Sequence, residues 1–188
     1  MATIGANLVK ELREKTGAGI MECKRALEET GGSIDKAMDL LRQQGLAKAD
    51  KKSGRQASQG LIEPYVHGAG RIASIVEVNC ETDFVARTPD FRELAHDIAM
   101  QVAATSPRYL DSDAVPAEDW AELEREFGSR ERAAEAVCLL DQPFIKDPKR
   151  TIRDVVKGGI AKIGENIVVR RFARFEVGAG LPEAGDGA

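Results

Sequence analysis

The sequence is poor in the side chains that most often carry catalysis or hold metals, with three cysteines and two histidines among 188 residues. Cys23, Cys80 and Cys138 are odd in number, share no metal-ligand spacing and lie in apolar surroundings. We therefore expect buried, reduced thiols and neither zinc ligands nor disulfides. His67 and His96 have no serine or cysteine nucleophile at a meaningful spacing, and His96 is interpreted as a solvated helix residue.

The chain also lacks the glycine-rich loops that hold phosphates. No phosphate-binding loop ending in Gly-Lys-Ser/Thr occurs, and the Gly-x-Gly runs at 17–19 and 178–180 do not continue into a dinucleotide fingerprint. We therefore expect no nucleotide binding by the chain itself, no metal site, no cofactor and no enzymatic activity.

Long hydrophobic runs are absent as well. The longest apolar stretches are of strand length, well below the about 20 residues that cross a bilayer, and the N-terminus shows no secretory pattern. We expect a cytoplasmic protein without membrane contact.

The charge balance argues against a protein whose main partner is nucleic acid. The net charge is −4 and the pI is near 5.4, whereas phosphate neutralisation needs a strongly basic surface. Lys48, Lys51, Lys52 and Arg55 form one local basic patch, which is interpreted as a solvated linker helix. An RNA-associated protein that uses this patch is left open, and its affinity for RNA would depend steeply on salt.

The first 45 residues predict a small three-helix module. An apolar residue at every fourth position over 4–12 indicates a first helix, and a second is expected over about 20–30. Ser33 can cap a third helix, which Gly45 is expected to end. The length and composition of the whole chain allow one medium domain in addition to this module.

The middle of the chain predicts an α+β core domain over residues 60–177, preceded by a basic linker over 46–59. Strand-like runs at 61–66 and 72–78 flank a glycine-rich turn and indicate a hairpin. Pro64 cannot donate to a strand ladder, so the first strand is expected at the edge of the sheet.

A long helix is expected to cover this sheet. Thr88 can cap it and Pro89 suits its first position, while Pro107 should end it. The segment 116–140 is helix-like but broken at Gly128. The apolar face of the long helix is formed by Phe91, Leu94, Ala95, Ile98 and Val102.

The C-terminal part predicts an extended run at 142–145, a helix from 151 to about 163 and a third strand over 166–177, which completes a three-stranded antiparallel sheet. The tail from 178 to 188 has little to bury and is expected to be disordered. One face of the third strand is predicted to carry Ile167, Val169, Arg171, Ala173, Phe175 and Val177.

An acid and a phenyl ring lie side by side between the second strand and the long helix. Asp83 and Phe84 occupy a short polar connection, and loops carry function more often than core elements do. A large aromatic at such a place either packs back on its own core or contacts a partner. Local chemistry alone leaves both possibilities open.

Three sequence blocks around these features resemble the bacterial translation elongation factor Ts family. The blocks are the Asn-Cys-Glu-Thr-Asp-Phe-Val run at 79–85, the N-terminal segments 8–12 and 16–27, and the Lys-Ile-Gly-Glu-Asn-Ile-Val-Val-Arg-Arg run at 162–171. They occur in the order typical of the family, and the resemblance covers about residues 4–177.

The resemblance implies a guanine-nucleotide exchange factor and not an enzyme. Members of the family bind EF-Tu, a GTPase, in its GDP-bound and nucleotide-free states and promote release of GDP. The family element that contacts EF-Tu near its magnesium site and dislodges the ion corresponds here to Thr82, Asp83, Phe84 and Val85.

The resemblance further implies a ubiquitin-associated-like fold for the N-terminal module, which would dock on EF-Tu near Arg13, Ile20 and Met21. Ile20 and Met21 could equally belong to the core of the module. His67, in the hairpin turn, resembles a second contact element of the family.

A homodimer is also expected, because a single three-stranded unit has few residues to cover an apolar strand face and because short family members resemble half of a longer, two-subdomain form. The alternative function is an adaptor, in which the three-helix module binds a peptide or ubiquitin-like surface and the sheet domain dimerises. Such an adaptor would bind its target through the isolated N-terminal module, without Phe84.

Overall fold

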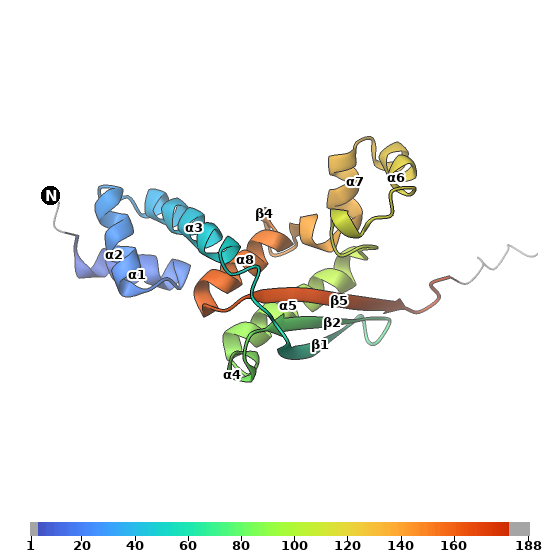
Figure 1. The fold of residues 1–188 in the computed structure, drawn as a ribbon, viewed down its shortest axis with the longest axis horizontal. Coiled ribbons are helices and arrows are strands. Elements are labelled where there is room, and N and C mark those ends of the chain that lie inside the picture. Colours follow the sequence, from blue (N-terminus) through green and yellow to red (C-terminus); the bar gives the residue numbers. More distant parts are fainter. Residues whose placement is uncertain (1–3, 181–188) are drawn as a thin grey trace, which may run out of the picture.

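The computed structural model describes residues 4–180 and has a three-helix module at one end and an α+β domain at the other (Figure 1). The α+β fold class is therefore confirmed. The predicted disordered tail, 178–188, lies outside the described residues from residue 181 onward. None of the described helices is long and apolar enough to cross a membrane.

The N-terminal module consists of α1 (Ala6–Thr16), α2 (Ile20–Glu29) and α3 (Ile34–Asp50), as the periodicity predicted. Gly17 ends α1 in the left-handed conformation, at φ 68°, where a side chain would be strained. The buried core of the module is small and consists of Leu12, Cys23, Ala26, Leu27 and Ala37. Its likeness to a ubiquitin-associated fold stays a prediction.

The predicted end of the third helix at Gly45 is wrong, because α3 continues to Asp50. Gly45 lies where α3 packs against α8 (Ile152–Ile163), and a Cβ atom there would be 3.2 Å from the Cβ of Ala161. A glycine inside a helix usually costs stability, but here it permits close contact between two helices. The first part of the expected linker, 46–50, is therefore helical.

The sheet has the order β1-β2-β5 with antiparallel neighbours. The strands are β1 (Gln59–His67), β2 (Ile72–Cys80) and β5 (Ile167–Glu176). The β1–β2 hairpin is confirmed, and Pro64 lies on the edge strand as predicted.

The predicted face of β5 is wrong beyond its first residues, because a β-bulge interrupts the alternation. Glu77 is opposite Arg171 but Val78 is opposite Val169, so Arg170 is an extra residue in β5. Ile167 and Val169 are buried as expected. Beyond the bulge the inward side is taken by Phe172 and Arg174, and Arg171, Ala173 and Phe175 are exposed instead.

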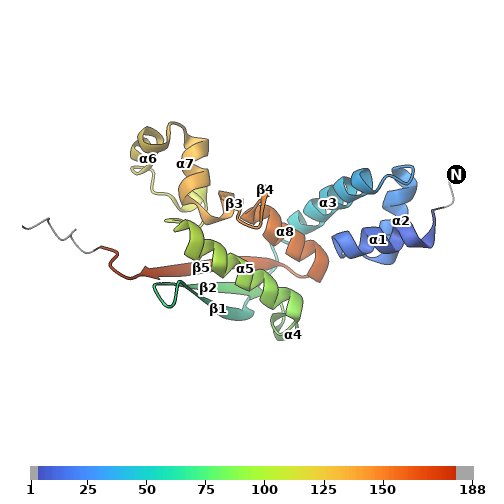
Figure 2. The same ribbon diagram turned by 180° about the vertical axis from the view of Figure 1, so that it is seen from behind.

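Helices α5 (Pro89–Thr105) and α8 cover one face of this sheet (Figures 1 and 2). Thr88 caps α5 by accepting from the Phe91 backbone N–H at 3.3 Å, and α5 ends just before Pro107, as predicted. Thr151 caps α8 in the same way. All five side chains of the predicted α5 face are buried: Phe91, Leu94, Ala95, Ile98 and Val102.

The segment between α5 and α8 forms a satellite of the core domain. It contains α6 (Trp120–Phe127) and α7 (Arg130–Val137), which are separated at Gly128 as predicted. The guanidinium of Arg130 lies 3.9 Å above the Trp120 ring and so fixes the two helices to each other. The expected extended run becomes β3 (Pro143–Phe144), whose pairing with β4 (Asp147–Thr151) the sequence did not predict.

Candidate functional site

The connection after β2 is a single helical turn, α4 (Asp83–Ala86), and not an irregular loop. Thr82 caps this turn, since its Oγ1 accepts from the Val85 backbone N–H at 3.4 Å. The Phe84 side chain is 81% exposed. The first possibility, that the ring packs back on its own core, is therefore excluded for this structure.

The remainder of α4 is anchored to the core domain. Ala86 is buried and Val85 packs against the main hydrophobic cluster. The Cys80 thiol donates to the carbonyl of Thr82 at 3.1 Å. Burial raises the pKa of the Cys80 thiol, and the negative charge of Glu165 adds to this effect, so the thiol stays protonated and able to donate. The ring is thus exposed on a backbone that is held in place.

Asp83 forms an ion pair on the surface of the turn. Its carboxylate accepts from Arg87, one turn further along, at 3.0 Å, and both side chains are largely exposed. This pair braces the exposed side of the turn with a weak interaction of the kind found on helix surfaces.

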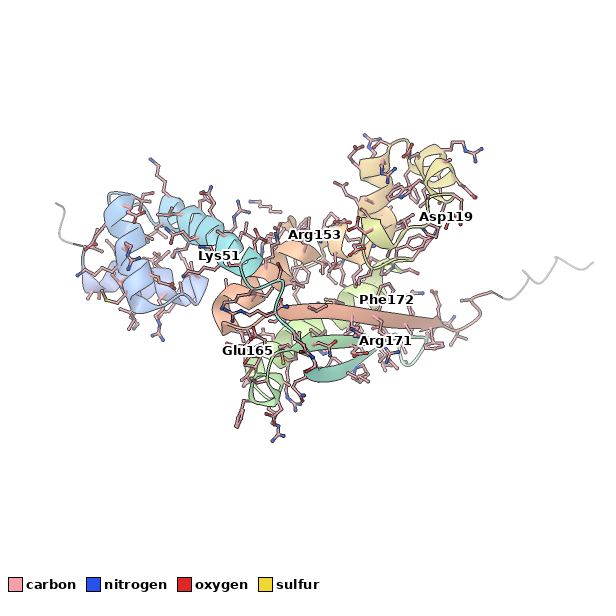
Figure 3. All side chains as sticks on the ribbon, viewed as in Figure 1. Lys51, Asp119, Arg153, Glu165, Arg171 and Phe172 are labelled. Carbon is pink, nitrogen blue, oxygen red and sulfur yellow. The ribbon has the colours of Figure 1, made fainter. Side chains whose placement is uncertain are left out.

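Glu165 is a site residue that sequence reasoning missed, and Figure 3 places it beside α4. Its carboxylate accepts from the backbone N–H groups of Glu81 and Thr82, both at 3.0 Å, and from the Thr82 hydroxyl at 2.7 Å. More than 80 residues separate Glu165 from its partners in sequence. The only sequence signal was its place in the third of the family-like blocks.

The candidate docking residues lie around the corner between α1 and α2. Ile20 is 56% and Met21 is 66% exposed, so the alternative that they form the module core is wrong. Arg13, in the last turn of α1, is exposed too. All three are therefore available to a partner on one corner of the module.

This corner also abuts the core domain. A Cβ atom at Gly17 would lie 3.3 Å from the side chain of Lys162, which itself pairs with Asp90 at 2.9 Å. The ends of α1, α8 and α5 therefore meet close to the corner.

The basic patch is largely engaged within the chain. Lys48 pairs with Glu22, Lys52 donates to the carbonyl of Gly164, and Arg55 lies 3.5 Å from Glu81. These interactions connect the linker to both domains and engage three of the four basic side chains, whereas Lys51 is exposed. Neutralisation of Lys48 and Arg55 by nearby carboxylates disfavours the RNA-associated alternative.

His67 lies far from α4. β1 pairs so that Gln59 is opposite Cys80 and His67 opposite Ile72, which puts His67 at the other end of the sheet, about 25 Å away at the usual rise of a strand. Its ring stacks on Tyr65 with centroids 6.1 Å apart. His96 pairs with Glu63 at 3.1 Å, close to the same tyrosine.

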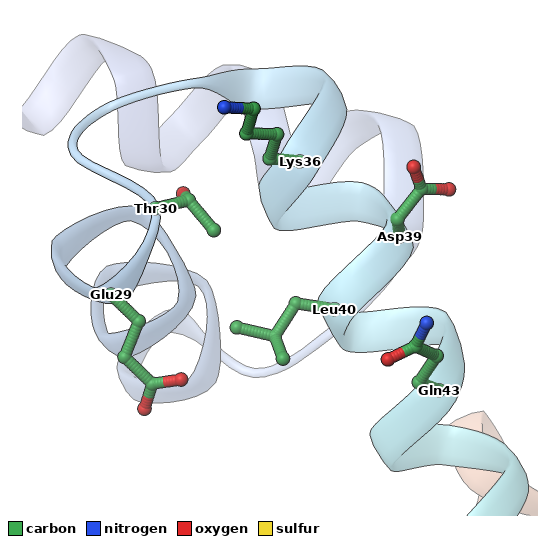
Figure 4. Close-up of a pocket in the computed structure, with 6 residues that line it drawn as sticks. All are labelled: Glu29, Thr30, Lys36, Asp39, Leu40 and Gln43. Atoms are coloured by element: carbon green, nitrogen blue, oxygen red, sulfur yellow. The ribbon is translucent and has the colours of Figure 1, made fainter.

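Two hollows of the surface lie away from α4. One of about 770 Å³ lies between the N-terminal module and α8, and its lining mixes basic and acidic side chains. A second, of about 370 Å³, is a charged groove between α2 and α3 with Leu40 at its base (Figure 4). Among residues 4–180 no cluster of three or more histidine, cysteine or acidic residues could hold a metal ion. All three cysteines are buried and free, as predicted.

Comparison with known proteins connects this geometry to a family. The family described as elongation factor TS matches residues 9–135. The elongation factor Ts of Carboxydothermus hydrogenoformans is 52% identical, over 95% of this chain and 91% of the relative. That of Finegoldia magna is 50% identical over 96% and 92%, and that of Desulforamulus reducens 50% over 99% and 94%. The chain therefore belongs to the elongation factor Ts family, the guanine-nucleotide exchange factors that act on EF-Tu in translation elongation.

Proposed function

We propose that the chain releases GDP from EF-Tu by inserting Phe84 into the nucleotide domain of the GTPase near its magnesium site. As an exchange factor it carries out no covalent chemistry of its own. The observation that carries this proposal is a phenyl ring, 81% exposed, on a helical turn whose other apolar side chains are anchored in the core domain. Such a ring gains more from a desolvated pocket than from water.

Release of GDP requires differential binding. A nanomolar nucleotide complex corresponds to about 12 kcal/mol, and a partner can weaken it only by binding the empty GTPase more tightly than the occupied one. The coupling is reciprocal, so GDP weakens binding of the factor by the same amount. An aromatic side chain at the centre of an interface contributes about 2 to 4 kcal/mol. Phe84 can therefore supply that much of the difference in binding free energy between empty and GDP-bound EF-Tu.

The magnesium ion in this mechanism belongs to EF-Tu. Its charge helps to hold the diphosphate, so displacement of the ion lowers phosphate affinity. Thr82, Asp83 and Val85 form the turn that carries the ring toward that site. The chain itself needs no metal for this role.

Docking is assigned to the N-terminal module. Ile20 and Met21 offer an exposed apolar surface at the α1–α2 corner, and Arg13 adds a positive charge beside it. His67 is proposed as a further contact at the opposite end of β1. In this arrangement the module supplies most of the ground-state affinity, and Phe84 acts mainly on the conformation that has lost its ion.

Release of fluorescent GDP from EF-Tu tests the mechanism. In the presence of Mg²⁺, the rate of GDP release should rise with the concentration of the factor and level off at a maximal rate, the plateau, when the factor is saturating. After removal of Mg²⁺ from EF-Tu by EDTA, the acceleration should be much smaller, because the step that the factor promotes has already occurred. Equal acceleration with and without Mg²⁺ would exclude the magnesium step.

We further propose that the chain forms a homodimer through the face of the sheet opposite α5 and α8. Val66 and Phe175 on this face are 63% and 65% exposed, and the register places both of them opposite Ala73. Ile75 lies beside them on the same face and is exposed as well. A contiguous apolar surface of this kind is typical of an interface.

Light scattering over a wide concentration range tests the dimer. The wild-type protein should show twice the monomer mass, and Phe175→Asp should shift the equilibrium toward monomer. Ile145→Asp is the matched control, because Ile145 is exposed but follows β3, outside the sheet. Monomer mass for the wild type at every concentration would exclude the dimer.

A further inference from the structure

The turn between α8 and β5 contacts the start of α4 through one side chain. Both carboxylate oxygens of Glu165 accept hydrogen bonds there: Oε2 from the N–H groups of Glu81 and Thr82, and Oε1 from the Thr82 hydroxyl. A charged acceptor strengthens each of these bonds relative to a neutral one.

The bond to the Thr82 hydroxyl controls the cap of α4. Thr82 Oγ1 also accepts from the Val85 backbone N–H. Because the hydroxyl proton is donated to Glu165, a lone pair of the same oxygen is left facing Val85. Glu165 thus orients the group that begins the turn on which Phe84 stands.

Glu165 is itself held by a reciprocal contact. The carboxylate of Glu81 accepts from the Asn166 backbone N–H at 2.7 Å. The buried Asn166 amide donates to the carbonyls of Ser53, at 3.3 Å, and Arg55, at 2.7 Å. The α8–β5 turn is therefore fixed to both the linker and the connection between β2 and α4.

Phe84 depends on this support more than a buried ring would. With most of its surface exposed, the ring has few side-chain neighbours that could set its direction. Its direction follows from the backbone of a helix only four residues long, and such a short helix is not stable by itself. The hydrogen bonds at its N-cap, Thr82, together with the packing of Val85 and Ala86, therefore set where the ring points.

We propose that Glu165 is a positioning residue for nucleotide exchange, which holds the Thr82 cap and thereby the direction of Phe84. This inference rests on the proposed role of Phe84. Glu165 acts through the turn and does not itself contact EF-Tu. Its removal should therefore lower the maximal rate of GDP release and leave docking intact.

The first experiment measures GDP release from EF-Tu with Glu165→Ala and Glu165→Gln at several factor concentrations. Glu165→Ala removes both acceptor oxygens and with them all three hydrogen bonds, and the plateau should fall about tenfold, the equivalent of about 1.4 kcal/mol. Glutamine keeps one acceptor oxygen and cannot satisfy both sets of donors, so its plateau should fall about threefold. The factor concentration at half of the plateau should change less than about twofold in both variants.

The matched control is Asp141→Ala. Asp141 also joins distant segments through three hydrogen bonds, from Ser112 at 2.9 Å and from Arg153 at 3.3 and 2.8 Å, but it lies in the satellite region. Asp141→Ala should lower the melting temperature as Glu165→Ala does, but it should leave the plateau of GDP release unchanged. If both variants lose the same stability and the same activity, Glu165 has a general structural role and the inference is wrong.

The second experiment combines Glu165→Ala with Phe84→Ala. Because Glu165 acts through the ring, the double variant should release GDP at the same plateau as Phe84→Ala alone. A further tenfold loss in the double variant would overturn the inference, as would a Glu165→Ala variant that raises the half-saturating concentration and keeps the plateau. Should Glu165→Ala fail to fold, Glu165→Gln in the same cycle decides.

The outcomes also separate this inference from the proposed function. A folded Phe84→Ala variant with the wild-type plateau would remove the ring from the mechanism altogether. If Phe84→Ala releases GDP slowly but a folded Glu165→Ala reaches the wild-type plateau, the role of the ring stands and only the positioning role of Glu165 is excluded.

Discussion

The two exposed apolar surfaces that we propose contact EF-Tu, Phe84 and the pair Ile20 and Met21, stand on differently stabilised parts of the chain. Phe84 stands on a four-residue helix that is tied to distant segments by hydrogen bonds and anchored in the main core through Val85 and Ala86. Ile20 and Met21 begin a ten-residue helix in a module whose buried core contains five mostly small side chains. The exposed side chains thus stand on a tightly fixed backbone at α4, but on a module with a small hydrophobic core at the α1–α2 corner.

The difference indicates a division of roles. A residue that must displace an ion has to reach one position, and small errors in that position reduce its effect strongly. A docking surface tolerates adjustment, because apolar contact is not directional. We therefore expect substitutions at α4 to change the maximal rate of release and substitutions at the α1–α2 corner to change the concentration of factor required.

The largest effect is expected from Phe84→Ala. Loss of about 2 to 3 kcal/mol in the ion-free conformation should slow release at saturating factor by about 30- to 150-fold. The melting temperature should not change, since the ring contributes little to the core. Stopped-flow release at several factor concentrations and circular dichroism check this. Ile145→Ala is the control for loss of an exposed apolar side chain elsewhere.

A smaller effect, on the concentration of factor required and not on the maximal rate, is expected when Ile20 and Met21 are both changed to aspartate. Placing two charges in an apolar contact should raise the half-saturating factor concentration about tenfold and leave the plateau unchanged. The same release assay measures both quantities. Lys36→Asp, an exposed change on α3, should alter neither. A reduced plateau without a shift in concentration would reverse the assigned roles.

Asp83→Asn should have a weaker effect. It removes the charge of the exposed pair with Arg87, which is worth about 0.5 kcal/mol on a helix surface, so the plateau should fall about twofold. Arg87→Gln should give the same result. A tenfold loss in Asp83→Asn that Arg87→Gln does not share would show that the carboxylate contacts EF-Tu directly.

The smallest effect concerns the N-terminal module and its pH dependence. The hydrogen bond from Lys48, with a further one from the Gly19 backbone N–H, holds the pKa of Glu22 below its ordinary value of 4.5. The resulting stability is present above pH 4.5 and is lost as the pH falls through the lowered folded-state pKa. Glu22→Gln should remove this dependence, with a difference of only a few tenths of a kcal/mol because the pair is partly exposed. Urea unfolding from pH 6 downward tests it, and a difference that does not change with pH would contradict the assignment.

Local signals in the sequence predicted those elements that local chemistry determines. Thr88 followed by Pro89 marked the start of α5, and Thr151 marked that of α8, because a cap depends on residues within one turn. The hairpin and the edge position of Pro64 followed from turn chemistry and from the missing N–H of proline.

The errors all involve partners that are distant in sequence. Gly45 was interpreted as a helix end, yet it lies inside α3 because Ala161 is close. The outward orientation of Phe175 follows from the bulge at Arg170, where Glu77 pairs with both Arg170 and Arg171. Pattern alone cannot show such contacts, because they depend on which segments meet.

The candidate site shows the same division. The run at 79–85 identified the turn, but its helical form and the three hydrogen bonds that Glu165 accepts required the structure. Helical periodicity left open whether Ile20 and Met21 belong to the core of the module, because both lie in the first turn of α2, where the apolar face of the helix is not yet defined. Their exposure in the structure excludes the core.

The uninterrupted course of α3 through Gly45 has a consequence for how the two surfaces work together. A helix of 17 residues is about 25 Å long, and its second half is packed on α8. The N-terminal module is therefore packed on the core domain along α3 and again at its α1–α2 corner, through Gly17 and Lys162, so the docking corner and Phe84 belong to one packed unit and are not joined by a flexible tether. If both surfaces have the proposed roles, binding of the corner raises the effective concentration of the ring at EF-Tu, as the first contact of a bivalent ligand does for the second.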